Sequence, residues 1–244
     1  MTSELLAADR EVLYDVRTLP RPDGYHLLLP SNWTYVDIRP QRSAKSIRRL
    51  VEDRVRRNPD LAAYRKELLG LFRAMVNDAL AHNVERLAVL SEAIGDDPLG
   101  ASLTVARAAG VPDVPDVPDA TEPADSPDPG GGEPTNHPDA LLAAARQAAD
   151  EGSDQVLPAP DREVELVAAA QQVVVRSAGL LVTRDPRTGH TAESFQAQYW
   201  IPEPGTTDVA VLTLASPCGG PALDPLTALF DLIALSFLWS WPPD

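Results

Sequence analysis

Two short runs rich in apolar, β-branched and aromatic residues lie near the start of the chain. They cover residues 25–29 and 34–38. Residues 30–33, between them, read Pro-Ser-Asn-Trp, which is a group of turn-forming residues followed by an aromatic. Such runs are typical of strands, and turn formers between them favour a connection that reverses the chain. The pattern predicts a β-hairpin in which Trp33 folds onto the core.

Further along, apolar residues recur at the spacing of one helix face. Residues 43–57 carry such a stripe and predict an amphipathic helix. Its apolar positions are Ile47, Leu50, Val51 and Val55. Asn58 and Pro59 supply an N-cap and a first-turn proline for a second helix, which is expected to end near Asn83. Two strands, at residues 85–91 and 101–106, complete a ββααββ order.

The later part of the chain predicts the order αββββα. A short helix is expected at residues 140–150. Strands are expected at residues 164–168, 172–183 with a break at Gly179, 194–201 and 208–215. Asp224 and Pro225 form a strong helix start. The apolar stretch that follows, as far as Trp241, is interpreted as a buried helix, because it is shorter than the roughly 20 residues that span a bilayer.

Residues 108–138 differ in composition from both sides. They contain eight prolines, seven acidic residues, three successive Val-Pro-Asp triplets and no Lys or Arg. Proline removes a backbone donor and the acids repel one another, which predicts a disordered, solvated linker. The grouped helices and hairpin-like succession of strands favour a twisted antiparallel sheet covered by helices. We expect residues 1–107 and 139–244 to be two halves of one α/β/α sandwich of the α+β class.

Composition and charge exclude several classes of protein. The net charge of -15 disfavours binding to nucleic acid or to anionic membranes. Cys218 is the only cysteine, so the chain forms no internal disulfide, no CxxC pair and no zinc site of several thiolates. The first ten residues carry acids and lack the basic and apolar regions of a secretory signal. These features together predict a cytoplasmic protein.

Four segments in this order resemble the PsbP-like family, which includes the Ran-binding Mog proteins. They are residues 25–33, 196–202, 209–216 and the apolar helix expected at 224–239. The paired helices and the acidic insertion differ from the compact members of the family. They are similar to features of uncharacterised actinobacterial proteins. The resemblance implies an α/β/α sandwich used mostly as a non-catalytic binding or assembly module. The resemblance assigns no active-site residues to this chain.

Two places hold side chains of catalytic type. His190 lies in the polar segment 185–193 with carboxylates and an arginine, and Cys218 precedes two glycines. A solvated loop does not preorganise such groups, and no histidine neighbours the cysteine in sequence. The four histidines lack metal-ligand spacing, and no phosphate-binding glycine motif is present. We therefore expect no cofactor, no metal and no enzymatic activity, with a hydrolase using His190 or Cys218 as an alternative.

A basic segment, residues 42–73, holds ten of the 21 basic residues and only four acids. On a helical wheel, one sector opposite the apolar stripe carries Arg42, Lys45, Arg49 and Arg56. An ordinary solvated face is the alternative, because Glu52 and Asp53 provide i,i+4 partners. Four basic residues at about 1 kcal/mol each give only about millimolar binding to an anionic membrane. A protein partner is therefore favoured over stable membrane association.

The sequence thus predicts a non-catalytic protein-interaction or accessory module that uses this basic face. A second alternative, beside the hydrolase, is a small-molecule or lipid carrier with a pocket under the terminal helix. Trp239 or Trp241 would then line the pocket.

Overall fold

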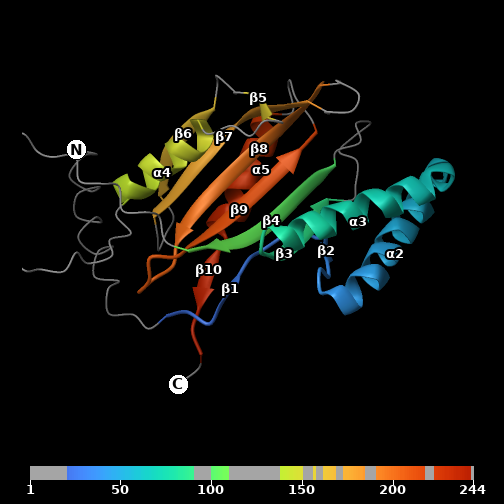
Figure 1. The fold of residues 1–244 in the computed structure, drawn as a ribbon, viewed down its shortest axis with the longest axis horizontal. Helices are drawn as coiled ribbons and strands as arrows, with labels where there is room; N and C mark the ends of the chain where they lie inside the picture. The colour runs from blue at the N-terminus through green and yellow to red at the C-terminus, as the bar shows by residue number, and fades with distance from the viewer. Residues whose placement is uncertain are drawn as a thin grey trace, which may run out of the picture.

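A computed structural model describes residues 21–90, 100–109, 138–150, 156–157, 162–168, 173–184, 191–217 and 223–242 (Figure 1). Its helices are α2 (Pro40–Arg57), a 3-10 helix (Pro59–Tyr64), α3 (Arg65–Ala81), α4 (Pro138–Asp150) and α5 (Leu223–Leu235). Its first strands are β1 (Gly24–His26), β2 (Trp33–Val36), β3 (Val84–Leu90), β4 (Ala101–Ala108) and β5 (Val156–Leu157). The others are β6 (Glu163–Ala168), β7 (Val173–Arg184), β8 (Thr191–Pro202), β9 (Val209–Ser216) and β10 (Leu238–Ser240).

The main sheet is antiparallel and runs in the order β2-β3-β4-β9-β8-β7. Both β5 and β6 pair with the outer edge of β7, at different points along it. Strand β4 pairs with β9 from Ser102 opposite Ala215 to Ala108 opposite Val209. Strands from the early and the late part of the chain therefore lie side by side in one sheet. The predicted antiparallel α+β fold is confirmed.

One face of the sheet is covered by α5 and by the small β1–β10 pair. The inward side chains of α5 include Leu226, Phe230 and Ile233, each at most 2% exposed. They meet alternate residues of the central strands, because successive side chains of a strand point to opposite faces. These strand residues are Leu103, Val105, Ala197, Tyr199, Leu212 and Leu214. The largest apolar cluster of the described residues lies here.

On the opposite face, the described helices lie toward the two margins of the sheet (Figure 1). At one margin, α2 and α3 pack on β2 and β3. This cluster contains Val36, Ile47, Leu50, Val51, Phe72, Val76, Leu87 and Val89. At the other margin, Leu141 and Ala145 of α4 pack on Val175 and Val209. Helices on both faces of one sheet give three layers.

A partly buried polar contact fixes α5 on the sheet. Asp231 accepts a hydrogen bond from the Tyr199 hydroxyl at 2.8 Å and from Arg176 Nη1 at 2.7 Å. Arg176 also forms an ion pair with Glu165. Burial, together with the bond to Asp231, raises the pKa of Tyr199 above its ordinary value. The carboxylate within an otherwise apolar helix therefore has a structural partner on two strands.

The predicted hairpin between residues 25–29 and 34–38 is wrong in its pairing. The turn forms, with the backbone N–H of Trp33 donating to the carbonyl of Pro30 at 3.0 Å, and Trp33 is buried as expected. However, β1 pairs with β10 and β2 pairs with β3. Tyr25 stacks on Phe237 at 4.9 Å between ring centroids, and this aromatic contact draws β1 away from β2.

The terminal helix is also shorter than predicted. Helix α5 ends at Leu235, and the chain continues as β10 rather than as a helix to Trp239 or Trp241. Residues two apart lie on nearly opposite sides of a helix but on the same side of an extended chain. Only the extended form lets Phe237 and Trp239 both contact Tyr25. Strand β7 runs through Gly179 without the expected break.

We predict that Asp231→Asn lowers the free energy of unfolding by about 2 kcal/mol, because Arg176 loses a charged hydrogen-bond acceptor. Urea denaturation of the full chain measures this change. Glu193→Gln, at an exposed position of β8, removes the same charge and is the control. Its expected effect is within about 0.5 kcal/mol. Equal stability of the two variants would contradict the structural role of Asp231.

Candidate binding surface

Helix α2 starts at a fixed position relative to the sheet. Pro40 occupies its first turn, where the missing N–H costs no helical hydrogen bond. The Asp37 carboxylate accepts hydrogen bonds from Nη2 of Arg39 at 2.6 Å and from the Arg39 backbone N–H at 3.1 Å. The backbone N–H of Asp37 donates to Ser46 Oγ at 3.0 Å. These bonds join the end of β2 to the first turns of α2.

The inner face of α2 is held by burial and by one arginine. Ile47, Leu50 and Val51 are buried against the sheet and α3. Arg54 Nη2 donates to the carbonyl of Leu90 at 3.0 Å, and its guanidinium lies 4.9 Å from the Phe72 ring centroid. Burial lowers the pKa of Arg54. This basic residue anchors the helix and does not belong to its outer surface.

The outer face of α2 carries the four basic residues that the sequence singled out. Arg42, Lys45, Arg49 and Arg56 are all exposed. At 3.6 residues per turn they fall within about 60° of one another, away from the buried stripe. We call this set the basic face. Asp53 contacts two of its members, Arg56 at 3.0 Å and Arg49 at 3.9 Å.

The other two members of the basic face have no such partner. Arg42 and Lys45 form no ion pair with any residue in the described part of the chain. Glu52, which the sequence offered as a partner for Arg48, instead pairs with Arg65 of α3 at 3.2 Å. Surface pairs of this kind contribute about 0 to 1 kcal/mol to stability. Asp53 brings a single negative charge to four positive ones, so it neutralises the basic face only in part.

Exposed apolar side chains lie on the segment that joins and follows α2. Tyr64 is 60% exposed and Leu71 of α3 is 62% exposed. Tyr64 directly precedes Arg65, whose guanidinium reaches Glu52 of α2. Both residues lie within the second helix that the sequence predicts between Pro59 and Asn83. The sequence could have indicated exposed apolar side chains here, because α3 has more apolar residues than one helix face holds.

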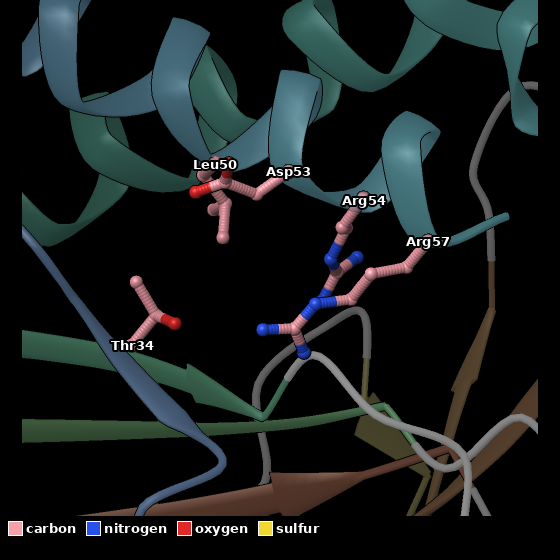
Figure 2. Close-up of a pocket in the computed structure, with 5 residues that line it drawn as sticks. All are labelled: Thr34, Leu50, Asp53, Arg54 and Arg57. Carbon is pink, nitrogen blue, oxygen red and sulfur yellow. The ribbon is translucent and has the colours of Figure 1, made fainter.

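A small cleft lies between α2 and β2 (Figure 2). It is lined by Thr34, Leu50, Asp53, Arg54 and Arg57. In Figure 2 the two arginine side chains extend from the helix toward the sheet, on the side opposite Thr34. The space measures about 20 Å³, which is enough for about one water molecule. This cleft does not accommodate an organic ligand.

The carrier alternative requires a chamber under the terminal helix. Phe237 is fully buried there, and Trp239 packs against it edge-on at 5.0 Å between ring centroids. The Trp239 indole N–H donates to the carbonyl of Pro202 at 2.9 Å. Both aromatic side chains are therefore packed in the core at this end of the sheet. Trp241 is 37% exposed.

The catalytic candidates cannot be placed. His190, Cys218 and most of the segment 185–193 lie outside the described residues, as does most of the linker at 108–138. Among the described residues, no three His, Cys, Asp or Glu side chains come together as metal ligands. Of the described helices, none has the length and apolar character needed to cross a membrane. The absence of enzymatic activity stays a prediction.

Comparison with known proteins gives little further information. No protein-family model matches the chain, and no curated protein matches it. Among solved structures the chain is similar to LpqN of Mycobacterium tuberculosis, which is described as involved in cell envelope biogenesis. The identity is 10%, the TM-score is 0.41, and the match covers 91% of this chain and 87% of that chain. The PsbP-like resemblance is therefore not established by these comparisons.

We predict a pH-dependent contact at the start of α2. The hydrogen bonds from Arg39 hold the pKa of Asp37 at about 2, below its ordinary value of 3.8. A folded-state pKa below the unfolded one stabilises the fold above the unfolded pKa, and the effect is lost as the pH falls through about 2. Carboxyl ¹³C titration by NMR should give that midpoint for Asp37.

Arg39→Gln should return the Asp37 midpoint toward 3.8, because it removes the hydrogen-bonding guanidinium. Arg42→Gln is the matched control, since Arg42 acts on Asp37 only through its charge and is the smallest cause of the shift. An Asp37 midpoint that is the same in wild type and Arg39→Gln would show that the contact at 2.6 Å is not formed in solution.

Proposed function

We propose that this protein is a non-catalytic interaction or accessory module that binds an acidic protein surface through the basic face of α2. The observation that carries the proposal is the exposure of Arg42, Lys45, Arg49 and Arg56 together on one side of a helix. The chain as a whole carries a net charge of -15, so this concentration of positive charge contrasts with the rest of the protein. The cytoplasmic location and the PsbP-like affiliation belong to the same proposal.

The attachment of α2 supports a binding role. Asp37 fixes its first turn and Arg54 fixes its last turns, so the backbone that carries the basic face is held at both ends. A surface that is ordered before binding loses less conformational entropy in the complex. Charge complementarity then mainly raises the association rate and sets partner choice.

The exposed side chains of Tyr64 and Leu71 add an apolar component to the segment that follows α2. Tyrosine and arginine are the residue types most enriched at the energetic centres of protein interfaces. A partner that presents acidic side chains around an apolar anchor would match both features. Nucleic acid and anionic membranes fit less well, because the remaining surface repels them.

The proposal is tested with a fluorescent oligoglutamate peptide as a defined acidic probe and with the full chain. Lys45→Glu together with Arg49→Glu should raise the dissociation constant at least about tenfold, because two attractive contacts become repulsive. Fluorescence anisotropy measures the change. Wild-type affinity should also fall as salt rises from about 0.1 to 1 M, where the Debye length shortens from about 10 to 3 Å.

The matched control is Lys66→Glu together with Arg73→Glu on α3, which makes the same charge change at exposed positions. Affinity purification from the native cell with both double variants then identifies physiological partners. If the α2 and α3 variants bind the peptide equally, and retain the same partners, the basic face is not the binding surface.

A further inference from the structure

A straight row of hydrogen-bonding side chains crosses the middle of the sheet, on the face that α2 and α4 flank. The strand register pairs Thr104 with Thr213, Thr213 with Gln198, and Gln198 with Ser177. Directly paired residues project from the same face. Neighbouring strands lie about 4.8 Å apart, so the row spans about 14 Å across β4, β9, β8 and β7. We call these four residues the polar row.

The polar row lies between the two helical margins. In the described structure, α2 and α3 pack on β2 and β3, and α4 packs on β6 and β7 (Figure 1). Thr104, Thr213 and Gln198 are half-buried, whereas the residues before and after them in each strand are in the fully buried core under α5. A face built for another layer of core would carry apolar side chains at these positions.

Arg162 stands at one end of the polar row. Its Nε donates to Ser177 Oγ at 2.5 Å and its Nη2 donates to Gln198 Oε1 at 2.8 Å. Both acceptors are neutral, and no acidic residue in the described part of the chain forms an ion pair with Arg162. The side chain is half-buried. Buried charges are usually paired, so a half-buried arginine with no acidic partner among the described residues indicates a place for an anion.

Gly179 provides the space that Arg162 occupies. A Cβ atom at this position would lie 3.0 Å from Cα of Arg162 and 3.3 Å from its Cβ and Cγ. The sequence suggested that Gly179 interrupts the strand, but β7 continues through it. The missing side chain instead allows the Arg162 stem to lie close against the strand, beside Ser177 and Gln198.

The free donors of Arg162 suit a carboxylate. Guanidinium has five N–H donors in one plane, and the two bonds to the polar row use two of them. Both N–H groups of Nη1 and the second N–H of Nη2 have no partner among the described residues. Nη1 and Nη2 together form the terminal fork, whose geometry matches two carboxylate oxygens. Beyond it, hydroxyl and amide groups recur at strand spacing, and each both donates and accepts hydrogen bonds. Alcohol groups of a ligand have the same property.

We propose that Arg162 and the polar row form a binding site for a small hydroxylated carboxylic acid. The carboxylate binds the terminal fork of Arg162, and the ligand hydroxyls bind Gln198, Thr213 and Thr104 along the row. General electrostatic attraction does not explain such binding, because the chain has a net charge of -15. The site lies on the sheet, and it is independent of the protein-binding role proposed for the outer face of α2.

The test uses the ¹⁵N-labelled full chain, with D-glucuronate as probe and D-glucose as the uncharged comparison. NMR titration should show saturable shifts of the Gln198 side-chain amide and of the Ser177 and Thr213 backbone amides. Glucose should bind at least about tenfold more weakly, since it lacks the charge-assisted bond. Absence of saturable shifts with glucuronate overturns the proposal. Inorganic phosphate binding as tightly as glucuronate overturns the hydroxy-acid assignment.

Variants of the site then separate binding from folding. Arg162→Gln should weaken glucuronate binding at least about tenfold, and Arg162→Lys should weaken it less, because it keeps the charge but loses the planar fork. Gly179→Ala, which displaces the arginine stem, should weaken binding with every charge retained. Arg146→Gln, at an exposed position of α4, is the matched control and should bind as wild type.

Thermal melting monitors the fold of each variant. Should Arg162→Gln fail to fold, Arg162→Lys and Gly179→Ala decide the question, because both keep the positive charge in the chain. Wild-type affinity in folded Arg162→Gln, or equal loss in Arg146→Gln, shows that Arg162 does not bind the carboxylate.

Discussion

The pairing of β4 with β9 is the contact on which the rest of the structure depends. It joins strands that lie a hundred residues apart in the sequence, at the centre of the main sheet. Side chains of both strands belong to the apolar cluster under α5, so the pairing also decides which residues face that helix. A shift of β9 by one residue against β4 would turn Leu212 and Leu214 away from the core and bring Thr213 into it.

The same register produces the difference between the two faces. Under α5, aromatic and aliphatic side chains are closely packed and Asp231 has two partners. On the other face, the described helices pack near the margins, apolar contacts reach Trp200 of β8 and Val211 of β9, and the polar row crosses the same strands. The basic face of α2 and the site at Arg162 are thus two different surfaces of one layer. One is built from the exterior of a helix, and the other from strand positions between the helices at the two margins.

The helices and strands that depend on local periodicity were predictable from the sequence. Helix α2 and its basic face follow from spacing within 18 residues, and most strands were found within a few residues of their ends. Pairing was not predictable in the same way, because β1 and β10 are joined by contacts between Tyr25 and a segment more than two hundred residues later. The polar row has no local signature at all. Strands β6, β7 and β8 must be in register before Arg162, Ser177 and Gln198 meet.

The β1–β10 pair has a mechanical consequence. Gly24 lies opposite Ser240, at the outer end of an antiparallel ladder whose other end is His26 opposite Leu238. A force that pulls the chain in opposite directions at these two points loads the hydrogen bonds one after another, beginning at Gly24. The force reaches the long central strands only after this short pair has opened. The β1–β10 pair therefore separates first, while the main sheet keeps its register.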